Sequence, residues 1–264
     1  MNTFTLRQRR ILKGLIGLFA VSMVLLLVVV NAPRSFSATP LTLELTVSAK
    51  DFREVLLRDW LQAPEPQGAL PSCGIGVTYL PDIAQAGGAL PSFGSLRCNL
   101  FVDSVGFVPA YVALLLFFTL AFGPPVATHP WLRQLLCVPA VAAGLFDVAE
   151  NSMTGRALDD LIQFALVDAT VADVTMASRV KWLLLSLAFA MLAWRVAVDA
   201  TDDKPWNAVA AAACGVAVLA LGAGGALVSH EAIGTGMAAA LTGVGVLAWR
   251  ALRPAPAVPP APGA

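Results

Sequence analysis

The sequence predicts an all-α transmembrane bundle of about six spans, with a small α+β insertion exported between the first two spans. Composition is the first reason: 58% of the 264 residues are hydrophobic and 13% are charged, whereas soluble domains are about 45–50% apolar and about 25% charged. The second reason is that apolar residues gather in separate stretches, and a helix of about 20 such residues crosses a bilayer. The third is that one sizeable polar region follows the first stretch.

The first apolar stretch, Leu15–Val30, follows four basic residues among the first 13. Basic residues ahead of an apolar span hold that end in the cytoplasm, so residues 1–31 are predicted to form an N-terminal membrane anchor. A cleaved signal peptide is the alternative, since passable cleavage sites lie near residues 32 and 37. The anchor is favoured because the apolar run is longer than a usual signal core. In either case the next segment is exported.

Residues 32–102 form the predicted exported insertion. Leu41–Val47 alternates apolar and polar residues, which is typical of a half-buried strand. Ala49–Gln62 carries an apolar stripe opposite a charged side, which predicts an amphipathic helix. Cys73 and Cys98 both lie in this region, and an oxidising compartment favours a disulfide between them. Closing a loop of about 25 residues would stabilise the protein by roughly 3 kcal/mol.

Residues 103–200 form the predicted transmembrane core of three spans. The second span of the chain begins near Val105, the third covers about Leu132–Asn151, and the fourth covers about Val180–Val198. Residues 156–177 keep a helical period but carry several acids. They are predicted to form either an interfacial helix or an outer extension of the fourth span.

Residues 201–252 form the predicted C-terminal hairpin, with spans over about Trp206–Val228 and Ala232–Leu252. Both spans are dominated by Ala and Gly, whose small size lets two helices approach closely. Residues 253–264 are rich in Pro and Ala and are predicted to be a disordered cytoplasmic tail. Six spans place both termini in the cytoplasm, so we expect a multi-pass protein of the bacterial inner membrane, within the cell envelope.

The most unusual polar group in the apolar regions is Asp147, Glu150 and Asn151, which share one helix face at the exported end of the third span. An ionised side chain at membrane depth costs roughly 2.5–3.5 kcal/mol, so we expect a counter-charge or a proton there. Lys181, at the outer mouth of the fourth span, is predicted to neutralise these acids. Three interpretations stay open: a helix end in the headgroup zone, a structural polar contact, or a ligand site. The predicted polar cluster consists of Asp103, Tyr111, Asp147, Glu150, Asn151 and Lys181.

Three short motifs are predicted to lie at the same level of the bundle. They are D-x7-Y (Asp103, Tyr111), D-x-x-E-N (Asp147 to Asn151) and S-x-x-K (Ser178, Lys181). In these motifs the chain resembles uncharacterised bacterial multi-pass membrane proteins. The resemblance covers roughly residues 41–195 and implies no activity.

From these residues we expect a non-enzymatic envelope protein, embedded in the lipid bilayer, that binds a partner or small ligand at the exported face through the acidic cluster. An ion-coupled or carboxylate-based small-solute transporter is the alternative. A membrane-embedded metal hydrolase comes third, with Asp103, Asp147 and Glu150 as ligands of a hard cation. The chain has only two histidines, and the usual hydrolase and nucleotide-binding motifs are missing, so no cofactor is expected and enzymatic activity is left open. Lys and Arg balance Asp and Glu at 17 each, which argues against a nucleic-acid partner.

Overall fold

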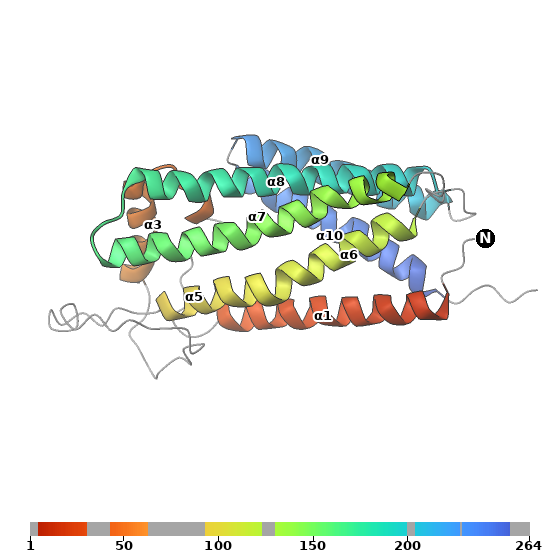
Figure 1. Cartoon of the computed structure of the whole chain (residues 1–264), viewed down its shortest axis with the longest axis horizontal. Helices are drawn as coiled ribbons and strands as arrows, with labels where there is room; N and C mark the ends of the chain where they lie inside the picture. The colour runs from red at the N-terminus through yellow and green to blue at the C-terminus, as the bar shows by residue number, and fades with distance from the viewer. Residues whose placement is uncertain are drawn as a thin grey trace, which may run out of the picture.

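The computed structural model describes residues 5–30, 43–62, 93–122, 130–199, 204–227 and 229–253, and this part of the chain is helical without strands. Figure 1 shows its elements, which are α1 (Leu6–Val30), α3 (Ala49–Gln62), α5 (Phe93–Val102), η1 (Asp103–Phe107), α6 (Val108–Ala121), α7 (Pro130–Ile162), α8 (Asp168–Ala197), α9 (Lys204–Leu227) and α10 (His230–Leu252).

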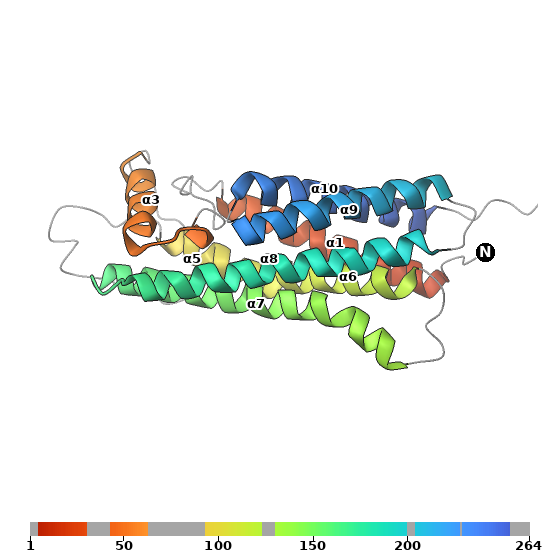
Figure 2. The same ribbon diagram turned by 90° about the horizontal axis from the view of Figure 1, so that it is seen from above.

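Five helices are long and apolar enough to cross a membrane, which makes the chain a multi-pass membrane protein. They cover Asn99–Ala121, Gln134–Leu161, Asp168–Ala197, Lys204–Leu227 and His230–Leu252. The first of these begins in α5, before the predicted start near residue 105, because apolar residues continue the helix outward. The long helices run along one common axis, and α3 lies at one end of them (Figures 1 and 2). We call this the α3 end of the bundle.

The order of packing follows the chain. Helix α8 packs against both α7 and α9, and α9 packs against α10, while α1 lies along α5 and α6 (Figure 1). Between α5 and α6 the backbone passes through the π-helical turn η1, and the Val108 N–H donates to the Asp103 carbonyl. Pro109 follows as the second residue of α6, a position that tolerates its missing N–H. The turn therefore keeps α5 and α6 continuous across a proline.

The predicted strand over Leu41–Val47 was wrong, and with it the α+β insertion. Leu43 and Glu44 are helical, and the residues that follow them up to Val47 form a turn and irregular structure. Glu44 and Thr46 are buried together with Leu43 and Leu45, whereas Val47 is 64% exposed. The alternating pattern was misleading because its polar side also faces the protein, where it finds polar partners. Residues 43–47 are called the Glu44 segment below.

The helix after the Glu44 segment begins at Ala49, as predicted. Ser48 Oγ donates to an Asp51 carboxylate oxygen at 2.7 Å and accepts the Asp51 N–H at 3.1 Å, which satisfies the first turn of α3. Phe52 and Leu56 are then buried in an apolar cluster that also holds Leu158 of α7. This cluster fixes α3 to the end of the α7–α8 pair.

The uncertain segment 156–177 is a helical hairpin. Helix α7 continues to Ile162 and ends near Phe164, which adopts a left-handed φ of 56°, a common way for a helix to terminate. Helix α8 begins at Asp168, whose carboxylate accepts the Ala49 N–H at 2.8 Å. Residues 168–177 therefore form the predicted extension of the fourth span, which contacts the start of α3, whereas residues 156–162 continue the third span.

The α9–α10 hairpin is close-packed at small residues. A Cβ on Gly236 would lie 2.7 Å from Leu221, and one on Gly243 would lie 2.8 Å from the Cys214 sulfur, so neither site has room for a larger side chain. A Cβ on Gly215 would meet nothing within 4 Å. The tight approach that the composition predicted is present, but only some of the small residues produce it.

Several expectations concern residues beyond the described ranges. Cys73 lies outside them, so the Cys73–Cys98 disulfide stays a prediction. The tail from residue 254 onward also lies outside them, as does the region of the signal cleavage sites.

Candidate functional site

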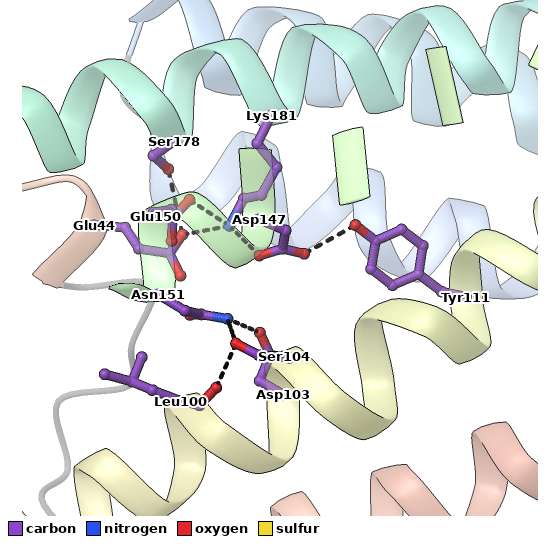
Figure 3. A network of polar contacts seen from close by, with 10 residues as sticks. All are labelled: Glu44, Leu100, Asp103, Ser104, Tyr111, Asp147, Glu150, Asn151, Ser178 and Lys181. Carbon is purple, nitrogen blue, oxygen red and sulfur yellow. Dashed lines mark hydrogen bonds and ion pairs between the residues drawn. The ribbon is translucent and has the colours of Figure 1, made fainter. Parts of the chain in front are cut away.

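Lys181, about halfway along α8, lies at the centre of a buried ion cluster (Figure 3). Its Nζ is 3.0 Å from Glu44 Oε2, 3.3 Å from Asp147 Oδ1 and 2.7 Å from Glu150 Oε2. The four residues are between 0% and 7% exposed. The predicted pairing of Lys181 with the acids of α7 is therefore present. These four residues are called the lysine cluster below.

The α-helical repeat and one close helix contact build the cluster. Asp147 and Glu150 are three residues apart and so lie on the same face of α7, which packs against α8 and its Lys181. On α7, a Cβ at Gly144 would stand 2.6 Å from Val112 of α6, so α6 and α7 approach closely there. This approach allows Tyr111 of α6 to donate to Asp147 Oδ2 at 2.9 Å.

Asp103 and Asn151 form a neighbouring pair rather than joining Lys181 directly. The Asn151 side-chain amide donates to Asp103 Oδ2 at 2.7 Å and to Ser104 Oγ at 3.0 Å. Ser104 in turn donates to the Leu100 carbonyl at 2.8 Å. The residues predicted from the sequence thus lie in one region (Figure 3), but they divide into the lysine cluster with Tyr111 and a separate contact between α7 and η1.

Glu44 was missed by the sequence reasoning. It is held by Lys181 and by the Ser178 hydroxyl, which donates to Glu44 Oε2 at 3.3 Å. Next to it, Thr175 Oγ1 donates to the Thr46 carbonyl at 2.5 Å. The available signal was an acid standing inside the otherwise apolar and neutral stretch LTLELTV. These contacts fix the Glu44 segment against the first half of α8.

The cluster presents more carboxyl groups than cations. Among the described residues, three carboxyl groups contact the one ammonium of Lys181, and Glu150 Oε1 has no hydrogen-bond partner. No set of three or more His, Cys, Asp or Glu side chains in the described ranges is arranged to hold a metal ion. The ammonium of Lys181 instead takes the place between carboxylates where a cation would bind.

A cavity of about 130 Å³ adjoins the cluster. Asp147 and Tyr111 line one part of it, and the remaining lining is apolar or aromatic and comes from α1, η1, α6, α8, α9 and α10. Met237 and Leu241 of α10 line the cavity and are also 38% and 49% exposed on the surface of the bundle. The wall of the cavity at α10 therefore includes residues that also lie partly on the surface of the bundle. The cavity is called the Tyr111 cavity below.

A second polar group lies at the C-terminal end of α8. It is about 20 Å from Lys181, because Arg195 follows Lys181 in the helix and each residue adds about 1.5 Å. Arg250 donates to Asp199 Oδ2 at 2.8 Å and to Asn207 Oδ1 at 2.5 Å, and Arg195 Nε donates to the Thr119 carbonyl at 3.1 Å. These side chains are buried. They stabilise the contacts of α8 with its neighbours.

The chain matches no protein-family model, no curated protein and no solved structure.

Proposed function

We propose that this protein binds a small lipid-soluble ligand in the Tyr111 cavity, with the polar end of the ligand beside Tyr111 and Asp147. The observation that carries the proposal is an apolar cavity inside a transmembrane bundle, with a hydroxyl–carboxylate pair and two surface-exposed α10 residues in its wall. A ligand dissolved in the bilayer would enter past Met237 and Leu241 without crossing water.

The size of the cavity supports a ligand segment of about one ring or a short chain. A cavity of about 150 Å³ with an apolar lining stays dry and accepts benzene, and the Tyr111 cavity measures about 130 Å³. A ligand that fills the cavity would cover the apolar side chains of its wall and would make dispersion contacts with them. The polar part of the ligand would then reach Tyr111 and Asp147 in the wall.

The burial of the lysine cluster favours a small ligand over a protein partner. Its residues are at most 7% exposed, so a protein surface would not touch them unless the Glu44 segment moved away. In the proposal the cluster holds Asp147, and through it Tyr111, in a fixed position at the cavity wall. The lysine cluster thus supports the binding site.

The placement in the membrane is part of the proposal. We infer that α1 is a sixth span, because it lies along α5 and α6 and its apolar run follows the basic residues of the N-terminus. Both termini then lie in the cytoplasm of a bacterial inner membrane, and the α3 end faces the exported side.

Transport is the weaker candidate. Between the lysine cluster and the group around Arg250, the interior is packed with apolar side chains such as Leu114, Leu185 and Leu221. A solute carrier needs polar groups along its path, and this interior offers few. A metal hydrolase is disfavoured because Asp147 and Glu150, its proposed metal ligands, already contact Lys181.

The test fills the cavity. Ala240 lines the cavity, so Ala240→Leu would occupy part of its volume, while Ala238→Leu adds the same atoms at an exposed position of the same helix. We expect native mass spectrometry of the purified protein to detect a retained small molecule on the wild type and on Ala238→Leu, and none on Ala240→Leu. Equal retention by the two variants, or none by the wild type, would contradict the proposal.

A further inference from the structure

The Tyr111 cavity has an unusual residue in its wall. Trp182 is 7% exposed, and its indole Nε1 has no hydrogen-bond partner in the described part of the chain. Buried indole N–H groups usually find an acceptor, and a buried donor without one is an exception that calls for an explanation. Trp182 also lines the cavity, so a molecule in the cavity lies next to this residue.

The position of Trp182 is fixed from two sides. Lys181 Nζ lies 4.6 Å from the centroid of the indole ring, which places the lysine cluster against the ring. Helix α9 packs directly on the same residue, since a Cβ on Gly225 would stand 2.9 Å from the Trp182 Cβ. A tryptophan held in this way is a rigid wall for whatever occupies the cavity.

We propose that the ligand of the Tyr111 cavity carries a neutral carbonyl oxygen that accepts a hydrogen bond from Trp182 Nε1. This inference rests on the proposed function and specifies its ligand class: lipid-soluble ketones, esters or quinone-type rings. A carboxylate would serve poorly as the acceptor, because Asp147 already lies in the wall and carboxyl groups outnumber the ammonium in the lysine cluster. A plain hydrocarbon would leave the indole N–H without a partner.

The experiment compares two probes of similar shape, acetophenone and ethylbenzene, added to the full-length protein in detergent micelles. The indole N–H signals of ¹⁵N-labelled tryptophan report on the acceptor, and Trp182→Phe assigns the signal among the six tryptophans. Labelled methyl groups of Met23 and Met237, which line the cavity, report on entry of either probe.

We expect both probes to shift the methionine signals, and only acetophenone to move the Trp182 indole N–H signal downfield. Trp182→Phe should weaken acetophenone binding about fivefold, as the loss of one neutral hydrogen bond would do, and leave ethylbenzene binding unchanged.

The outcomes separate the two proposals. If both probes shift the methionine signals but neither moves the indole signal, the carbonyl ligand is refuted and the cavity keeps its role. If neither probe shifts the methionine signals, nothing enters the cavity and the proposed function fails together with this inference. Should Trp182→Phe fail to fold, replacing each of the other five tryptophans by phenylalanine assigns the Trp182 signal by elimination, and the wild-type spectrum then decides.

Discussion

Replacing Lys181 by methionine is the most informative perturbation of this protein. Methionine keeps a long apolar side chain and removes the ammonium, so the substitution leaves the packing of α8 largely intact. Glu44, Asp147 and Glu150 would then remain buried together without their cation. The result should be a large loss of stability that comes from charge rather than from a cavity.

The expected size follows from the distances. Each contact of 2.7–3.3 Å has a Coulomb attraction of about 5–6 kcal/mol at an effective dielectric constant of 20. Desolvation and repulsion between the carboxylates cancel most of this, and removing one partner of a buried ion pair costs about 3–5 kcal/mol in practice. At about 2–4 °C per kcal/mol for a protein of this size, the melting temperature should fall by about 10 °C.

Thermal melting in detergent, followed by tryptophan fluorescence, measures this change. The matched control is Lys50→Met, because Lys50 pairs with Glu54 at 3.7 Å on the surface with its side chain 81% exposed. Such exposed pairs contribute about 0.3–0.5 kcal/mol, so the control should melt within about 2 °C of the wild type. If Lys181→Met also melts within that range, the lysine cluster does not stabilise the fold and the reasoning is refuted.

A double-mutant cycle isolates the electrostatic part. In the wild type, Glu150→Gln removes a carboxylate that Lys181 stabilises, so it should be neutral or destabilising. In the Lys181→Met protein the same change relieves repulsion with Asp147 and should raise the stability by at least about 1 kcal/mol, within the usual range of coupling between neighbours. Equal effects in the two proteins would show that the residues do not interact.

Two further substitutions test the neighbourhood of the cluster. Gly144→Ala should destabilise the protein by about 1–3 kcal/mol, because its Cβ would lie 2.6 Å from Val112. The control Gly155→Ala meets nothing within 4 Å and should be neutral or slightly stabilising in the same melting assay. The opposite order of the two variants would exclude a tight contact between α6 and α7. Tyr111→Phe removes the hydroxyl donor that lies 2.9 Å from Asp147, so the free energy of unfolding should fall by about 1.5–3 kcal/mol. This loss should occur only when residue 147 is Asp. An undiminished effect of Tyr111→Phe in an Asp147→Ala protein would contradict this contact.

The helices could be predicted from the sequence because each depends on local pattern and length. The capped start at Ala49 and the long apolar stretches of α6, α8, α9 and α10 carry their own signals, and the structure has helices there. The strand at Leu41–Val47 failed for the opposite reason. Alternation describes which side chains are buried only when one side faces water, and here Glu44 contacts α8 and Thr46 is buried as well.

The candidate site could be predicted in part. Helix geometry puts Asp147 and Glu150 together, and the order of the spans brings Lys181 to the same level, so three members of the lysine cluster followed from the sequence. Glu44 did not, because its contact joins residues 137 positions apart and depends on how the segment before α3 folds back. The Tyr111 cavity was also beyond prediction, since its wall comes from several helices and depends on their packing.

The most direct test of the central claim is an experimental density map of the protein extracted together with its native lipids. We expect density for a bound molecule in the Tyr111 cavity, in contact with Trp182 and reaching toward Leu241, while the lysine cluster stays closed beside it. A map in which the cavity is empty, or is filled by the protein's own side chains, would contradict this expectation.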